Sequence, residues 1–264
     1  MKSIRRSKGI DSHPIFRLGK ARAKKDPRNL RLATILRLPV KVPSEYDFDV
    51  KHPQVPTPMF ANDRLGCCVI AGRAHQTLRF ELAERRRLLG IKDSDVTSEY
   101  FRESGGKDSG LVVGDSLNEW RKQGWRAAGK RYYIQGYAEV APRNHLQVKQ
   151  AIFSDIGIGI GLALPNSANA QIQAGKVWDV VSGPSAKPNS WGGHYVHLPG
   201  YTRSGPVCVT WGRKQQMTWA FFDKYCDEAF AIIDAVDRLK TRRLIDARKL
   251  RVFLGTVTRV RRRK

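Results

Sequence analysis

The chain has 264 residues, which is enough for one sizeable domain with extensions or for two small domains. Its hydrophobic fraction of 41% supports a folded core, and its formal net charge is +24. No apolar run approaches the ~20 residues that cross a bilayer, so a membrane span is not expected. The basic residues 1–8 lead into no apolar segment, so export through a signal peptide is not expected either.

Most of the positive charge lies at the two ends of the chain. Residues 1–41 hold 13 Lys and Arg against two Asp, a net charge of +11. Residues 237–264 hold 12 against two, a net charge of +10. Clustered cations gain affinity for polyanions by releasing counterions from phosphates. The sequence therefore predicts a nearly neutral body, residues 42–236, between an N-terminal basic arm and a C-terminal basic helix or tail.

These arms have two interpretations. They are either solvated extensions or the contacts through which the protein binds DNA, RNA or another polyanion, such as an acidic protein surface or anionic lipid. The cations that we expect to contact nucleic acid are Arg5, Arg6, Lys24, Lys25, Arg242, Arg243, Arg261, Arg262 and Arg263.

Four cysteines, two of them adjacent, fit neither a disulfide framework nor a zinc site. We therefore expect no metal ion and no cofactor. This cysteine usage favours a reducing compartment, the cytoplasm or a particle assembled there.

In chain order, the first long element expected is a helix from Cys68 to about Leu89, which stops before Gly90. Apolar residues recur every four positions, the pattern of a helix with one buried face: Ile70, Ala74, Leu78 and Leu82. Cys68 follows a turn-forming run and lies at or near the helix N-terminus, where unpaired amides and the helix dipole favour the thiolate. A cysteine in this position is suited to nucleophilic catalysis.

Shorter elements follow. Helices are expected at residues 95–101, 115–123, 145–153 and 218–225, the last capped by Thr218. Strands are expected at residues 132–140, 156–164, 195–198, 207–211 and 228–233. Three alternating glycines in residues 156–164 indicate close backbone packing, because their spacing does not match a phosphate-binding loop.

Three motifs in this order resemble those of the papain-like cysteine peptidases. The chain reads N-D-R-L-G-C-C at 62–68, W-G-G-H-Y-V-H-L-P-G-Y at 191–201, and V-T-W-G at 209–212 with M-T-W at 217–219 and Y-C-D-E-A-F at 225–230. The likeness is strongest to a poorly characterised branch found in bacteria and their phages, with N-D-x-x-G-x-C and G-G-H motifs. It implies an α+β, papain-like fold, in which a central helix carrying the cysteine packs on an antiparallel sheet or half-barrel carrying the histidine, with basic extensions.

Carried to the matching positions, the resemblance implies a thiol hydrolase of peptide or amide bonds. Cys68 would be the nucleophile, and His194 would be the general base and later the acid. Asn62 stands six residues before the cysteine, where the family has a glutamine, and would donate its side-chain amide to the oxyanion.

The third catalytic position departs from the family pattern. An asparagine normally orients the histidine, but the matching residue here is Val209, which has no polar side chain. Thr210 or Asp179 would then take the orienting role. Trp211 is expected to shield the histidine, and His197, an odd step along the strand, is expected to face away from it.

Two functions therefore remain open. One is a papain-like hydrolase with basic arms. The other is a non-catalytic papain-fold protein of a phage virion or another nucleoprotein assembly, whose arms hold genome or RNA. The partners expected are nucleic acid or another polyanion, with a protein substrate or a virion partner in addition.

Overall fold

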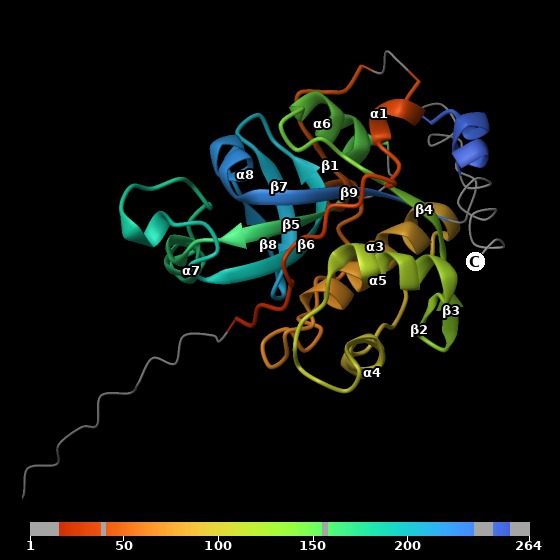
Figure 1. Cartoon of the computed structure of the whole chain (residues 1–264), viewed down its shortest axis with the longest axis horizontal. Helices are drawn as coiled ribbons and strands as arrows, with labels where there is room; N and C mark the ends of the chain where they lie inside the picture. Colours follow the sequence, from red (N-terminus) through yellow and green to blue (C-terminus); the bar gives the residue numbers. More distant parts are fainter. Residues whose placement is uncertain (1–15, 38–40, 155–157, 235–244, 254–264) are drawn as a thin grey trace, which may run out of the picture.

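The helix that begins at Cys68 lies between a group of helices and an antiparallel sheet (Figure 1). The computed structural model describes residues 16–37, 41–154, 158–234 and 245–253. One hydrophobic core surrounds this helix and its neighbours, and a second one covers the rest of the sheet. The α+β class and the antiparallel sheet expected from the sequence are confirmed.

Seven strands form the main sheet, and every pair in it is antiparallel. In spatial order the strands are β4 (Ile134–Glu139), β9 (Cys226–Asp234), β5 (Ile158–Leu164), β6 (Gly192–Tyr201), β7 (Pro206–Thr210) and β8 (Arg213–Gln216), with β1 (Tyr46–Asp47) also pairing β6. A separate hairpin joins β2 (Trp125–Ala127) to β3 (Lys130–Tyr132). Strands β5 and β6 therefore lie near the middle of the sheet.

The helices that lie where the sequence predicts them are α3 (Cys68–Arg85), α4 (Asp93–Ser104), α5 (Val113–Lys122), α6 (His145–Phe153) and α8 (Trp219–Tyr225). The sequence did not predict α1 (Leu32–Ile35), α2 (Phe48–Lys51), α7 (Asn166–Gln173) or the 3₁₀ helix η1 (Pro184–Ala186). Helix α6 has the predicted bounds, and the predicted cap of α8 is present, since the Thr218 hydroxyl accepts from the Phe221 amide. None of the helices among the described residues is long and apolar enough to cross a membrane.

Helix α3 begins at the predicted residue and ends at Arg85 rather than near Leu89. The expectation of a single buried face is wrong, because every residue from Cys68 to Leu82 is buried. Strand β6 covers one side of the helix and α4 covers another. A helix enclosed on several sides loses the polar face of an amphipathic surface helix, and its charged residues then need internal partners.

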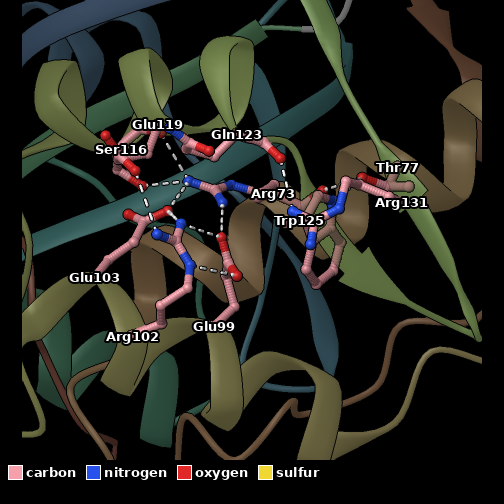
Figure 2. Close-up of polar contacts among 10 residues, drawn as sticks. All are labelled: Arg73, Thr77, Glu99, Arg102, Glu103, Ser116, Glu119, Gln123, Trp125 and Arg131. Carbon is pink, nitrogen blue, oxygen red and sulfur yellow. Dashed lines mark hydrogen bonds and ion pairs between the residues drawn. The ribbon is translucent and has the colours of Figure 1, made fainter.

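Figure 2 shows how one of these buried charges is held. The guanidinium of Arg73 lies 3.0 Å from Glu99 Oε1 and 2.8 Å from Glu103 Oε1, both on α4. It also donates to the Ser116 carbonyl of α5 at 2.8 Å. A buried cation is tolerated when carboxylates and acceptors satisfy it, so this network joins three helices around one side chain.

Glycines let β5 and β6 approach α3 and β9 closely. A Cβ at Gly159 would lie 1.7 Å from the Tyr195 hydroxyl oxygen, and a Cβ at Gly72 of α3 would lie 2.6 Å from the Tyr195 ring. A Cβ at Gly161 would lie 2.6 Å from the Glu228 side chain on β9. The predicted role of the strand glycines in close packing is therefore confirmed for Gly159 and Gly161, whereas Gly157 lies outside the described residues.

The described part of the predicted N-terminal arm packs on the body. Phe16, Leu30, Leu32 and Ile35 are all buried, and the backbone of residue 36 forms a β-bridge to residue 245. Residues 247–253 are helical, which agrees with the basic helix expected there. The remaining residues of both arms lie outside the described residues, and the division into domains stays a prediction.

Candidate active site

Cys68 and His194 come from the two parts of the molecule and lie on α3 and β6, which pack against each other. Cys68 is the first residue of α3, and His194 lies near the start of β6. Each is only 1% exposed. The backbone of Tyr195, the residue after His194, acts to lower the pKa of the Cys68 thiol, against the effect of burial. The fold therefore brings together two residues that are 126 positions apart in the sequence.

Burial decides the charge state of this pair. It raises the pKa of Cys68 to about 11, although hydrogen bonds from the backbone amides of Tyr195 and Gly19 and the charge of Lys20 act in the opposite direction. It lowers the pKa of His194 to about 3, and the positive charge of Lys20 adds to that effect. The expectation of a thiolate is wrong for this form, because the loss of water outweighs the helix N-terminus. At neutral pH the pair is a thiol and an uncharged imidazole.

The imidazole of His194 is fixed on two sides. Its Nε2 lies 2.7 Å from Thr210 Oγ1, and its ring stacks on Trp211 with the centroids 4.0 Å apart and the planes 8° apart. Its Nδ1 is buried and has no hydrogen-bond partner among the described residues. Asp179, the alternative orienting residue, instead accepts a hydrogen bond from the Thr218 hydroxyl at 2.8 Å.

Asn62 is buried in the turn before α3, and its side-chain amide already has two acceptors. Nδ2 donates to the Leu65 carbonyl at 3.0 Å, within its own turn, and to the Arg17 carbonyl at 3.3 Å. In this form no hydrogen of that amide is left for another acceptor. The Arg17 carbonyl also accepts from the indole nitrogen of Trp211 at 3.2 Å.

Arg17 belongs to a segment, residues 16–21, that we call the strap. In Figure 1 the red N-terminal segment crosses the boundary between the helical part and the sheet. Its backbone is bound on both sides: Lys20 N–H donates to the Gly193 carbonyl at 3.0 Å, and the amide of Leu111 donates to the Gly19 carbonyl at 2.8 Å. The Ala21 amide returns a bond to the Leu111 carbonyl at 2.9 Å. The strap therefore covers the Cys68–His194 pair.

Gly19 lets the strap approach the cysteine turn. A Cβ at this position would lie 1.7 Å from the carbonyl oxygen of Gly66, which real side chains never do. A cavity of about 450 Å³ opens beside the strap. Its lining includes Arg17, Lys20, Gly66, Trp191 and Gly193.

The other predicted residues are placed as follows. His197 faces the core, with Nδ1 3.2 Å from the Ile158 carbonyl, on the side of β6 opposite His194. Lys24 forms an exposed ion pair with Asp115 at 3.0 Å, and Lys25 is exposed. The remaining expected nucleic-acid contacts lie outside the described residues: Arg5, Arg6, Arg242, Arg243, Arg261, Arg262 and Arg263.

Sequence reasoning missed the strap and the ion pairs that anchor it. Lys20 contacts Asp227 and Glu228, more than 200 residues away, so no local pattern pairs them. The available signals were a Leu-Gly pair inside a basic segment and two adjacent acids at the start of a strand.

No family model matches the chain, and no curated protein matches it. Among solved structures, xylellain, a cysteine protease from Xylella fastidiosa, is similar with a TM-score of 0.64 and 16% identity, over 86% of this chain and 99% of that one. A proCathepsin B from Trypanosoma congolense is similar with a TM-score of 0.61 and 12% identity, over 83% and 87%. A cysteine protease from Carica candamarcensis, in complex with E-64, has a TM-score of 0.55 and 14% identity, over 73% and 99%. The chain therefore has the papain-like fold.

Proposed function

We propose that the chain is a thiol hydrolase that cleaves a peptide or related amide bond through an acyl-enzyme, with Cys68 as nucleophile and His194 as general base and acid. The observation that carries the proposal is the setting of the His194 ring. Thr210 holds Nε2 and Trp211 covers the face, whereas Nδ1 has no hydrogen-bond partner among the described residues. A ring fixed at one nitrogen and free at the other suits a general base.

In the proposed reaction, Nε2–H of His194 donates to Thr210 Oγ1, and Nδ1 accepts the thiol proton of Cys68. The sulfur attacks the carbonyl carbon of the scissile bond, and the protonated ring passes its proton to the leaving amine. Water then attacks the thioester while Nδ1 takes a proton from it. That proton returns to the sulfur as the acid product leaves.

The negative charge that develops on the carbonyl oxygen needs hydrogen-bond donors. We assign this role to the backbone amide of Cys68, which begins α3 and has no partner within the helix, and to Asn62 Nδ2. In the strapped form Asn62 donates instead to Arg17. The Arg17 carbonyl thus occupies a donor that the substrate needs, so the strapped form is the inactive one.

The test uses the full-length chain with Gly19→Val, because a valine side chain cannot fit against Gly66 and displaces the strap. We expect this variant to hydrolyse fluorogenic peptides, and Cys68→Ala in the same background to lower kcat/KM about 1,000-fold or more. Cys208→Ala, at a buried cysteine on β7, serves as the matched control and should keep the activity. Activity that survives Cys68→Ala contradicts the proposal; an inert Gly19→Val variant favours a non-catalytic papain-fold protein of a virion or other nucleoprotein assembly.

We also propose that the two ends bind nucleic acid. The supporting observation is the charge distribution, since residues 1–41 and 237–264 carry +21 of the +24. Deleting residues 1–41 is a poor test, because it also removes buried Leu32 and Ile35 from the core. Charge-neutralising substitutions avoid this difficulty.

Replacing Arg261, Arg262 and Arg263 by Gln should weaken binding to a random-sequence DNA duplex. It should also lower the slope of log affinity against log salt by about three, one for each lost phosphate contact. The matched control replaces three exposed lysines of the body by Gln: Lys107, Lys122 and Lys187. Equal losses of DNA affinity in the two triple variants would contradict the assignment of nucleic-acid binding to the ends of the chain.

A further inference from the structure

The strap places one lysine side chain in a buried acidic pocket. The side chain of Lys20 is only 2% exposed, and its ammonium lies 2.9 Å from Asp227 Oδ2 and 3.3 Å from Glu228 Oε1. The Glu228 side chain is 9% exposed and that of Asp227 is 35% exposed. Both residues lie near the start of β9, so their carboxylates belong to the body and not to the strap.

The pocket lies beside the catalytic pair. The backbone amide of Lys20 donates to the carbonyl of Gly193, the residue before His194. A Cβ at Gly193 would lie 2.2 Å from the Lys20 carbonyl oxygen, and a Cβ at Gly161 would lie 2.7 Å from Glu228 Oε1. Gly193 therefore leaves room for the backbone of the strap at Lys20, and Gly161 leaves room for the side chain of Glu228.

The same backbone groups can hold an extended peptide that has glycine at the position of Gly19, where any Cβ would meet the carbonyl of Gly66. Gly193 on one side and Leu111 on the other bind the main chain of the strap. A substrate bound through these groups presents one side chain at the position of Lys20. That side chain meets Asp227 and Glu228.

Without the strap, the two carboxylates lose their cation. Burial already raises the pKa of Glu228 to about 7, with Lys20 acting against the rise and Asp227 adding to it. Two adjacent carboxylates in a largely buried pocket are costly to keep charged without a positive partner. An apolar or acidic side chain supplies no such partner, whereas an ammonium or guanidinium does.

We propose that Asp227 and Glu228 form a specificity pocket that selects a lysine or arginine side chain of the substrate, and that Lys20 occupies it as a stand-in. This inference rests on the proposed hydrolase function, since it names the substrate class of that site. The preferred substrate is an unfolded peptide segment with a glycine directly before the lysine or arginine, as in the strap.

The experiment uses the full-length Gly19→Val protein and a set of fluorogenic peptides in which each position in turn carries Lys, Arg or norleucine. Norleucine has the length of lysine without the ammonium. At one position we expect kcat/KM for Lys and Arg to exceed that for norleucine by about tenfold or more, as for a charge-assisted contact. The double substitution Asp227→Asn, Glu228→Gln should bring that ratio near one.

Asp115→Asn, at an exposed acid on α5, is the matched control and should leave the ratio unchanged. Hydrolysis with no preference for Lys or Arg, or a preference that survives the double substitution, overturns the pocket and leaves the hydrolase standing. Peptide binding by Gly19→Val, Cys68→Ala, measured by fluorescence anisotropy, gives a readout that needs no catalysis. If Lys peptides bind better there while no variant hydrolyses them, the pocket stands and the hydrolase fails; if neither occurs, both are overturned.

Discussion

Thr210 places a hydroxyl beside His194, whereas the papain-like pattern has an asparagine one residue earlier. Its Oγ1 lies 2.7 Å from Nε2 of His194, at the end of β7. Val209, the residue at the family position, is buried and apolar. The hydroxyl oxygen can accept a hydrogen bond from the ring N–H, so it is suited to fix which nitrogen carries the hydrogen.

Thr210→Val keeps the shape of this side chain and removes the acceptor. We expect kcat of the strap-released Gly19→Val enzyme to fall about 10- to 100-fold, because the imidazole is no longer held in the required orientation. KM should change little, since Thr210 does not lie where a substrate binds. Thr210→Ser, which keeps the hydroxyl, should stay within about threefold of the parent. A Thr210→Val enzyme as fast as its Ser counterpart would contradict the orienting role.

At this scale the motifs were enough to single out Cys68, His194 and Thr210 as candidates, because their order and spacing are local in the sequence. The partners of Lys20 were not predictable, since the contact joins residues more than 200 positions apart. The charge state of Cys68 was also mispredicted. Sequence shows a helix N-terminus, but it does not show how much water the folded chain excludes from the sulfur.

At the scale of elements, the network around Arg73 joins α3, α4 and α5 (Figure 2). Arg73→Ala removes the buried cation that Glu99 and Glu103 share. We expect the free energy of unfolding to fall by about 3–5 kcal/mol, measured by urea denaturation. Arg102, which also pairs with Glu99 but is partly exposed, is the control; Arg102→Ala should cost about 1 kcal/mol or less. Equal losses would mean that burial does not set the strength of these pairs.

Element prediction succeeded where periodicity or capping is explicit. The start of α3, the bounds of α6 and the cap of α8 were all predicted correctly. Helix α7 was missed, because its sequence N-S-A-N-A-Q-I-Q is polar or small at nearly every position and shows no apolar repeat. The full enclosure of α3 was missed because Arg73 and Arg79 look like surface residues until their partners, which lie on other elements, are known.

At the scale of the whole molecule, we propose that the strap controls the reactivity of the Cys68 thiol. With the strap bound, burial raises the pKa of Cys68 to about 11, so at pH 7 nearly all of the thiol is protonated. Alkylation of Cys68 by iodoacetamide should therefore be slow at pH 7 and rise about tenfold per pH unit up to pH 10. Mass spectrometry of the alkylated peptides would follow each cysteine separately.

Gly19→Val should raise the rate of Cys68 alkylation at pH 7 by about tenfold or more, because water and the His194 ring then reach the sulfur. Gly90→Val is the control, since a Cβ at that glycine meets no neighbour and Gly90 lies far from the strap in sequence. Equal rates for the parent and Gly19→Val would show that the strap does not protect the thiol.

The strap is also an intramolecular ligand of the surface that it covers. Its local concentration is on the order of millimolar whatever the concentration of the protein, so a free peptide competes with it poorly. The stretch that follows it, residues 22–29, carries the exposed Lys24, Lys25 and Arg28 and lies before the buried Leu30. A single proteolytic cleavage in residues 22–29 would release the strap as a separate peptide. On dilution that peptide would dissociate and not rebind. Dissociation of the uncleaved strap is reversible, whereas loss of the strap after cleavage is permanent.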